Sequence, residues 1–536
     1  MDFVRDFLPL VKKIGFESGD SNLNLRQTTP GLLVILATLF ILYSYFISNR
    51  STLLLPPSPP KHWISGNASQ RNPPYRHVVF GTEYKDKYGS IISLTTRTET
   101  QIIINTAELA TELLEKQTAY TSGRAHNVMV YDIMNWGTSV AYQPHDERHK
   151  KSRRVIASAF HPAAARSYAM QHRDSALGLI SLINAQPDDF EKHVKEISGA
   201  FVMRLVYGHI VTKDDPMLKT VREAISYLSK GSRFFWVNQF PILKYVPAWV
   251  PGAGFQILGR EGRILRNRMV DESFDAVYDQ VRRGRVEQPS YTSRLLEDKG
   301  GVNVSEEDEN LIKWTAGSMF AAGSTTTVDI IMAFFLQMAL HPEVAKVAQG
   351  EIDAVVGRER LPELSDRENL PYFEATLLEV IRLWPPIPLG AGHSTSKELE
   401  FEGYRIPKGA NVFANIWAIL RDSSCYPSPH TFDPARFLKS TPDPDPRKYV
   451  FGFGKRVCPG IHVANNSTFV MTAGLLSVFD ISATPELMAK VETLGGRDSM
   501  EMYKMSSPSG PLIDILPFSA KFKLRDPAAV TLVSDH

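Results

Sequence analysis

Cysteine is almost absent from this chain: its 536 residues include only two, Cys425 and Cys458. Two thiols cannot form a disulfide framework or a four-cysteine zinc site. An excess of charge of one sign is also missing, because 60 Lys and Arg residues face 58 Asp and Glu residues. The formal net charge of +2 therefore gives no reason to expect a nucleic-acid partner.

Linkers and dinucleotide motifs are missing as well. Residues 70–525 contain no low-complexity linker and no internal repeat, which favours one large domain over several smaller ones. No G-x-G-x-x-G sequence follows a strand-like run, so the chain shows no dinucleotide site of its own. An enzyme built on this chain would have to receive NADPH-derived electrons from a separate protein.

One of the two cysteines lies in a glycine-rich, cationic stretch, residues 451–460, which reads FGFGKRVCPG. Lys455 and Arg456 are expected to lower the free-energy cost of a Cys458 thiolate, as would a bound metal. The glycines at 452, 454 and 460 are expected to take unusual φ values and to let the backbone approach a flat ligand. The alternative is a buried free cysteine that packs as a small hydrophobe, and Cys425 is expected to be a structural thiol near the surface.

This stretch resembles the haem-binding loop of the cytochrome P450 family at five positions: Phe451, Gly454, Arg456, Cys458 and Gly460. The resemblance implies haem b (iron protoporphyrin IX) as the cofactor, with the Cys458 thiolate as the axial ligand of the iron. It also implies the cytochrome P450 fold, which is mainly α with small β-sheets, preceded here by one N-terminal transmembrane helix.

An uncharged run near the N-terminus, residues 31–47, reads GLLVILATLFILYSYFI. As a helix with ~1.5 Å rise per residue it would span ~26 Å, close to the thickness of an endoplasmic reticulum bilayer. We therefore predict an N-terminal tail (1–30), a transmembrane anchor (31–48), a proline-rich hinge (49–70) and a haem-thiolate monooxygenase domain (71–536). A cleaved signal peptide is the alternative to the anchor.

The orientation of the anchor does not follow from its flanking charges, because lysine and arginine residues lie on both sides of it. The resemblance implies a single-pass protein of the endoplasmic reticulum membrane with a cytosolic catalytic domain. Residues 56–60, PPSPP, are stiff and extended, which marks the boundary between the anchor and that domain.

Two segments are candidates for holding the haem propionates. His149 and Arg153 lie four residues apart and so share a helix face. The family usually has Trp-x-x-x-Arg here; His149 replaces the tryptophan, although imidazole can also donate to a carboxylate. His393 falls where the family often places another propionate donor, with a surface histidine as the alternative. The basic neighbours expected on the surface, where they could also dock an acidic reductase, are Lys150, Lys151 and Arg154.

The distal side of the haem is expected on a helix over residues 310–341, whose centre reads AAGSTTT. Threonines are poor helix formers, and a kinked core helix is the alternative interpretation. By resemblance, Ala322 and Gly323 leave space for dioxygen and Thr326 directs protons to it. The family usually has Asp or Glu before this threonine, whereas this chain has Thr325, so hydroxyl groups and water are expected to serve in the proton supply.

A helix predicted over residues 370–384 carries Glu379 and Arg382 three residues apart on one face. In the family this pair joins an arginine of a later loop, here Arg436, in a buried charge network that braces the cysteine loop. Glu-x-x-Arg alone occurs on many helices, so this structural role follows from the resemblance.

Other segments complete the expected fold. The aromatic and proline-rich residues 234–255 are expected to cover the substrate pocket or contact the membrane, with ordinary core as the alternative. The remaining predicted elements are a small N-terminal sheet with strands at 91–94 and 101–104, mostly helices over 108–230, a hairpin over 403–409, a buried helix over 461–479 and late strands over 500–525.

The resemblance implies a haem-thiolate monooxygenase that inserts one oxygen atom from O2 into a lipophilic small molecule. Its partners would be NADPH–cytochrome P450 reductase, cytochrome b5 as an additional donor, the membrane and the substrate, with no nucleic acid. The chain resembles fungal secondary-metabolite members of the O-methylsterigmatocystin oxidoreductase and tryptamine 4-monooxygenase type, which points to a terpenoid, polyketide or indole substrate. Three alternatives are a haem-thiolate isomerase or dehydratase that does not use O2, a non-catalytic haem-binding membrane protein, and a membrane-anchored protein without haem.

Overall fold

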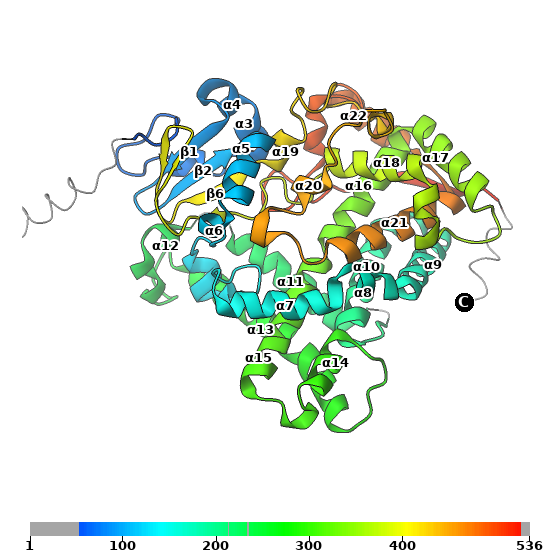
Figure 1. Ribbon diagram of the computed structural model, residues 1–536, viewed down its shortest axis with the longest axis horizontal. Helices are drawn as coiled ribbons and strands as arrows, with labels where there is room; N and C mark the ends of the chain where they lie inside the picture. Colours follow the sequence, from blue (N-terminus) through cyan, green and yellow to red (C-terminus); the bar gives the residue numbers. More distant parts are fainter. Residues whose placement is uncertain (1–52, 213, 233–234, 527–536) are drawn as a thin grey trace, which may run out of the picture. The chain divides into compact units, whose positions relative to one another are not determined.

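The computed structural model describes residues 53–212, 214–232 and 235–526. The predicted tail (1–30) and anchor (31–48) lie outside the described residues. In the part of the chain that is described, helices predominate and three small sheets accompany them (Figure 1). This agrees with the mainly α fold predicted from the sequence.

The longer helices begin at clear capping signals. Before α11, for example, the Asp215 carboxylate accepts a hydrogen bond from the Met217 N–H (2.9 Å), and Pro216 occupies the first helical position. The helices of six or more residues are α3 (Arg76–Gly81), α4 (Glu83–Tyr88), α7 (Glu147–Phe160), α8 (Pro162–Ser167), α9 (Ala169–Ala185), α10 (Phe190–Tyr207), α11 (Pro216–Gly231), α13 (Gly254–Arg282), α14 (Tyr291–Asp298), α15 (Glu306–Gly323), α16 (Thr326–Leu340), α17 (Pro342–Val355), α18 (Pro371–Leu383), α21 (Ile461–Val478) and α22 (Pro485–Thr493). The four-residue helices are α5 (Ala107–Ala110), α6 (Thr118–Thr121), α12 (Trp236–Gln239), α19 (Ile416–Ile419) and α20 (Arg447–Val450).

A four-stranded sheet joins two distant parts of the sequence (blue and yellow in Figure 1). Its strands, in spatial order, are β1 (Ile91–Thr95), β2 (Thr100–Ile104), β6 (Asn411–Ala414) and β3 (His393–Ser394). β1 and β2 are antiparallel, as are β6 and β3, whereas β2 and β6 are parallel. The predicted N-terminal strands are thus confirmed, and the sheet brings the segment that follows β2 close to His393.

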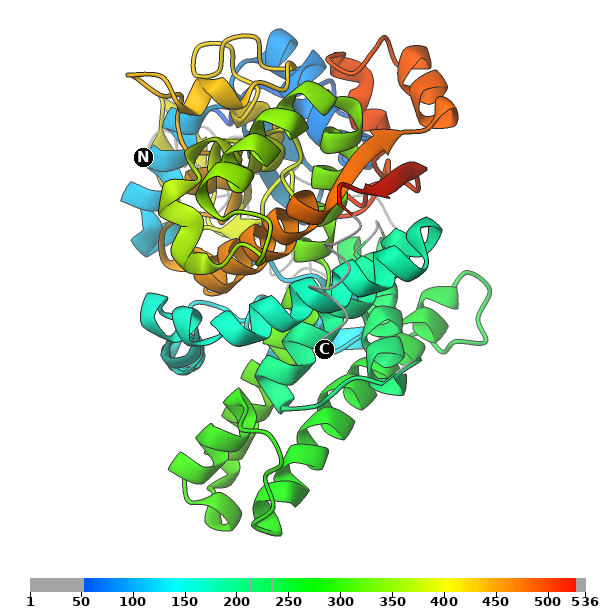
Figure 2. The ribbon, with the colours of Figure 1, turned by 90° about the vertical axis from the view of Figure 1, so that its right-hand side faces the viewer.

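Two antiparallel pairs complete the sheets. β4 (Leu399–Phe401) and β5 (Tyr404–Ile406) form a hairpin with its turn at Glu402 and Gly403, which begins four residues before the hairpin predicted over 403–409. β7 (Phe479–Ala483) pairs with β8 (Ala520–Leu524), seen in orange and red in Figure 2. The late strands predicted over 500–525 are confirmed only for β8, because residues 500–505 form a 3-10 helix and three prolines interrupt residues 506–519.

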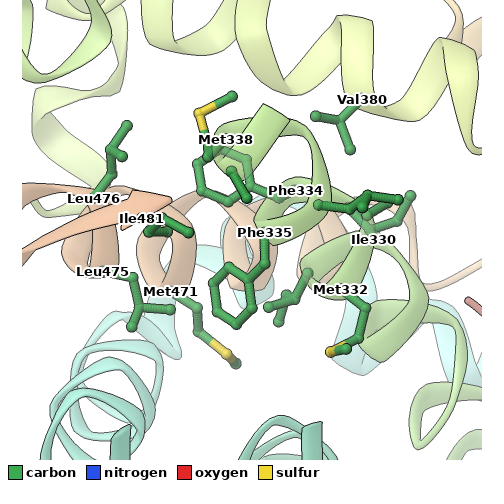
Figure 3. Packing of buried hydrophobic residues seen from close by; sticks show 14 of the residues in the cluster. Ile330, Met332, Phe334, Phe335, Met338, Val380, Met471, Leu475, Leu476 and Ile481 are labelled. Atoms are coloured by element: carbon green, nitrogen blue, oxygen red, sulfur yellow. The ribbon is translucent and has the colours of Figure 1, made fainter. Parts of the chain in front are cut away.

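The largest hydrophobic core surrounds α16, which is buried along its length after residue 327. Phe334 and Phe335 of α16 pack among side chains from α18, α21 and β7 (Figure 3). A helix that is apolar on all sides is expected at the centre of a large protein. The buried helices over 371–383 and 461–478 match the predicted elements within a few residues.

The predicted distal helix, residues 310–341, is interrupted. α15 ends at Gly323 and α16 starts at Thr326, so the sequence prediction of one helix was wrong at its centre. Among the described residues, the run Glu306–Leu340 is long and apolar enough to cross a membrane, yet most of its apolar part is buried inside the protein. The run therefore belongs to the core of this domain.

Candidate active site

The cysteine loop, residues 451–460, connects α20 to α21. The Cys458 N–H donates to the Phe451 carbonyl (2.8 Å) and closes the loop. Gly452 (φ +82°) and Gly454 (φ +54°) take left-handed conformations, as expected. Gly460 has φ −86° at the start of α21, so the expectation of an unusual φ at this third glycine was wrong.

Burial raises the pKa of the Cys458 thiol, while a backbone hydrogen bond from Gly460 and the Arg153 guanidinium act in the opposite direction. Arg153 of α7 is thus the nearby cation that favours the thiolate. The expectation that Lys455 and Arg456 have this role is corrected, because Lys455 is exposed and Arg456 bonds to other groups. A metal bound to the sulfur would favour the thiolate further.

Arg456 ties the cysteine loop to two other segments. Its Nε donates to the Ser122 carbonyl (2.8 Å), its Nη2 donates to the Gln143 carbonyl (2.7 Å), and its Nη1 lies 2.8 Å from His149 Nε2. Burial, followed by the charge of Arg124, lowers the pKa of Arg456 to about 9. Burial and then Arg456 lower the pKa of His149 to about 3, so His149 is neutral at pH 7 and accepts the Arg456 hydrogen bond.

Arg124, which sequence reasoning missed, belongs to the same site. Its Nε donates to the Ala141 carbonyl (2.9 Å), and its Nη1 donates to the carbonyls of Ala391 (2.9 Å) and Gly392 (2.7 Å). Burial lowers the pKa of Arg124 to about 10, and Arg153 acts in the same direction. No motif marks this single arginine in the sequence, because the chain pairing between residues 123 and 394 brings it into place.

His393 is buried at the start of β3, which excludes the alternative of a surface histidine. Its Nδ1 lies 2.9 Å from the Thr121 carbonyl, which can only accept, so Nδ1 carries the proton. Burial, followed by the charge of Arg124, lowers the pKa of His393 to about 3. A carboxylate beside Nε2 would raise this pKa and favour the imidazolium.

We define the cation cluster as Arg124, Arg153 and Arg456, with the neutral rings of His149 and His393 beside them. Over the described residues, none of its three arginines forms an ion pair with a carboxylate. The cationic side chains lower one another's pKa values, so anions placed beside them would be stabilised. The cluster therefore fits a ligand with two carboxylates, such as the two propionates of haem, next to the loop that holds Cys458.

The distal residues lie at the break between α15 and α16. Ala322 is exposed and residues 323–327 are half-buried, whereas residues 328–340 are all buried. The Thr326 hydroxyl donates to the Ala322 carbonyl (3.3 Å), an arrangement that bends helices. A Cβ on Gly323 would lie 2.9 Å from Val202 Cγ2, so this glycine allows close packing against α10.

The distal residues and the cysteine loop sit on separate elements. In the part of the chain that is described, no hydrogen bond or ion pair joins residues 322–327 to residues 451–460. α7, which carries His149 and Arg153, packs against both α15 and α21 and so connects the two groups (Figure 1).

Glu379, Arg382 and Arg436 form one ion-pair network in which all three side chains are almost fully buried. Arg382 Nε lies 2.7 Å from Glu379 Oε2, and Arg436 Nε lies 3.0 Å from Glu379 Oε1. Glu374 of α18 and Arg447 of α20, which sequence reasoning did not single out, form a second ion pair (2.7 Å). This pair fixes the helix that immediately precedes the cysteine loop.

Residues 56–495 match the family model described as Cytochrome P450. This chain belongs to the cytochrome P450 family. The match covers both halves of the candidate site, the cation cluster with the cysteine loop and the distal residues.

Curated relatives of this P450 are similar over most of their length. It is 35% identical to cytochrome P450 monooxygenase ppsD of Aspergillus oryzae, over 84% of this chain and 87% of that protein. It is 33% identical to cytochrome P450 monooxygenase COX2 of Coprinopsis cinerea, over 90% of this chain and 91% of the relative. It is also 33% identical to tryptamine 4-monooxygenase of Psilocybe cyanescens, over 84% and 91% of the two chains.

Membership of the family makes this P450 an oxygen-using monooxygenase with haem b as its cofactor. The three alternatives, an isomerase or dehydratase, a non-catalytic haem protein and a protein without haem, are set aside on this ground. Members of the family take electrons from a redox partner and act on lipophilic substrates.

Proposed function

We propose that this P450 hydroxylates or epoxidises a lipophilic small molecule in fungal secondary metabolism, with a terpenoid, polyketide or indole as the substrate. The three relatives described above are fungal monooxygenases, and one of them is named for the oxidation of tryptamine. The motifs that resemble O-methylsterigmatocystin oxidoreductase support the same class of pathway.

The cation cluster beside the cysteine loop is the observation that carries this proposal. Bound haem supplies a redox-active iron that activates O2. Cys458 would hold the iron from one side, and the cation cluster would hold the propionates. The loop residues that would shape the proximal surface are Phe451, Gly454 and Gly460.

On the distal side, Ala322 would leave space for dioxygen, and the Thr326 hydroxyl would direct protons to it. Thr325, in place of the usual acid, would add a hydroxyl to the hydrogen-bonded path. Glu379, Arg382 and Arg436 would brace the cysteine loop without contacting the reactants, because their network is closed and buried.

The proposed location is the endoplasmic reticulum membrane, with the anchor at residues 31–48 and the catalytic domain, residues 71–536, in the cytosol. Large exposed apolar side chains support contact of the domain with a membrane: Trp63 is 85% exposed, Ile242 is 72% exposed and Trp249 is 83% exposed. NADPH–cytochrome P450 reductase would supply electrons, with cytochrome b5 as an additional donor, and the exposed basic residues of α7 are the proposed docking surface: Lys150, Lys151 and Arg154.

The role of Cys458 is tested by the absorbance of the reduced protein under carbon monoxide. We expect native protein to show the thiolate-type Soret band and Cys458→Ser to lose it, because serine cannot supply a thiolate. Cys425→Ser is the matched control and should keep the band. Native protein without the band would contradict the proposal.

The substrate class is tested by product analysis. Membranes that contain this P450 and a reductase should convert an apolar substrate to a product heavier by one oxygen atom, in a reaction that consumes NADPH and O2. Mass spectrometry on panels of terpenoids, polyketides and indoles identifies the class. Turnover confined to hydrophilic substrates would contradict the proposal.

A further inference from the structure

Asp329 lies in the first turn of α16 and is 8% exposed. Its Oδ2 atom has no hydrogen-bond partner among the residues that the structure describes. Buried carboxyl groups that serve only the fold are normally paired or hydrogen-bonded, because an unpartnered polar group costs free energy. A purely structural role therefore does not account for this carboxyl group.

Thr326 and Asp329 are three residues apart in one helix, so their Cβ atoms lie about 5–6 Å from each other on the same face. The Asp329 N–H donates to the Thr325 carbonyl (3.2 Å), which fixes the aspartate one turn beyond the helix break. The Thr326 hydroxyl donates its proton to Ala322, so its oxygen remains free to accept one. No hydrogen bond joins the two side chains in the structure, so an acid at this distance would act on the hydroxyl through one water molecule.

The charged groups that act on Asp329 come from two other elements. Burial raises the pKa of Asp329 well above its usual range, the charge of Asp514 raises it further, and the charge of Lys195 on α10 lowers it. Burial therefore favours the protonated form of this carboxyl group over the carboxylate. Asp514 is itself exposed, between buried Ile513 and Ile515.

The position of Asp329 also favours release of that proton when a base is available. The N-terminus of α16 begins at Thr326, and the positive end of the helix dipole stabilises an anion in the first turn. Burial and the dipole act in opposite directions on the carboxylate. Such a balance is typical of groups that exchange protons.

We infer that Asp329 is a positioning residue that supplies protons to the Thr326 hydroxyl, in place of the acid that the family usually has at position 325. The inference rests on the proposed monooxygenase function. Each turnover consumes one O2, two electrons from the reductase and two protons, and yields one oxidised product and one water. Asp329 gives its proton through one water molecule to Thr326 Oγ1, while that hydroxyl leaves the Ala322 carbonyl and releases its own proton towards dioxygen, and the carboxylate then regains a proton from solvent.

The first test needs no catalysis. The infrared spectrum of the protein at pH 7 should contain the C=O stretch of a neutral carboxylic acid that shifts in D2O, and Asp329→Asn should lose this band. Asp215→Asn is the matched control, because Asp215 is equally buried but accepts hydrogen bonds from Met217, Leu218 and His209. The band should persist in that variant, and its absence from the wild-type protein would overturn the inference.

The second test measures coupling in protein reconstituted with reductase. Asp329→Asn should keep the thiolate-type Soret band under carbon monoxide, slow product formation on the order of 10²-fold, and release more peroxide per NADPH. Adding Thr325→Asp to Asp329→Asn should restore coupling, since it places an acid at the position that the family uses. A purely structural role predicts no such rescue.

The outcomes separate this inference from the proposed function. If the wild-type protein lacks the Soret band, the proposed function fails. If the wild type has the band but Asp329→Asn couples NADPH to product as well as the wild type does, only the role of Asp329 fails. If Asp329→Asn does not bind haem, Asp329→Glu is tested instead. Asp329→Glu should retain the infrared band and most of the coupling of NADPH oxidation to product formation. Loss of that coupling with the infrared band intact would overturn the inference.

Discussion

Gly452 and Gly454 both have positive φ values in the cysteine loop, yet they meet different surroundings. A Cβ on Gly452 would have the Arg456 carbonyl oxygen as its nearest neighbour, at 3.6 Å. A Cβ on Gly454 would clash with Thr118 Oγ1 and lie 2.6 Å from the Leu114 carbonyl oxygen. Gly454 is therefore required by the close approach of residues 114–118 as well as by its own backbone conformation.

Replacing each glycine by alanine separates the two effects. We expect Gly452→Ala to lower the free energy of unfolding by about 1–2 kcal/mol, from the left-handed conformation alone. Gly454→Ala should lower the free energy of unfolding by ~1–3 kcal/mol more than Gly452→Ala does, because the added methyl group overpacks the site. It should also reduce the fraction of protein with the thiolate-type Soret band. Urea unfolding and absorbance under carbon monoxide measure both quantities. Equal losses in the two variants would contradict the role assigned to the Thr118 contact.

Site residues could be predicted from the sequence where they belong to short contiguous motifs. Cys458 and Arg456 share one loop, and Glu379 and Arg382 share one helix face, so spacing alone brings each pair together. Arg124 could not be found in this way, because its position depends on the pairing of residue 123 with residue 394. The prediction that Lys455 stabilises the Cys458 thiolate was wrong for a related reason, because closeness in sequence does not determine which way a side chain points.

At the scale of elements, apolar runs located the helices but not their interruptions. Residues 310–341 read as one helix, and the break at 324–325 coincides with hydroxyl side chains that bond back to carbonyls of the preceding turn. Whereas these hydroxyl groups interrupt one helix, the ion-pair network of Glu379 joins separate segments. It joins α18 to η9 (Pro434–Phe437) and the loop at residues 427–431 through two arginines, and so fixes three segments that precede the cysteine loop.

Removing the charge of Glu379 should therefore loosen these segments together. Glu379→Gln leaves the guanidinium groups of Arg382 and Arg436 buried without their shared anion, and we expect a loss of about 3–5 kcal/mol in the free energy of unfolding. Glu398→Gln is the control, because its ion pair with Arg405 (3.3 Å) is solvent-exposed and should contribute under ~1 kcal/mol. Equal urea-unfolding midpoints for the two variants would contradict the bracing role.

At the scale of the whole molecule, buried histidines away from the cation cluster make the fold sensitive to acid. Burial is the largest cause of the lowered pKa of His77 (about 3) and of His172 (about 4). The unfolded chain binds protons at these sites below pH 6.5, whereas the folded protein does not. Stability contributed by the neutral rings is therefore complete above pH 6.5 and is lost as the pH falls towards the folded pKa values.

His172 isolates this effect, because burial is the only cause of its shift and neither ring nitrogen has a hydrogen-bond partner among the described residues. Its ring stacks on Phe201 at 4.6 Å, so His172→Phe keeps the packing and removes the titration. Between pH 6.5 and about 4, each such histidine contributes a slope of up to ~1.4 kcal/mol per pH unit, with stability rising as the pH rises. Urea unfolding should show that the free energy of unfolding falls less between pH 7 and pH 5 in His172→Phe than in the wild type. The variant His62→Phe, at an exposed position, should lose as much as the wild type does. If His172→Phe loses as much free energy of unfolding between pH 7 and pH 5 as the wild type does, the His172 ring must take up its proton without unfolding the chain.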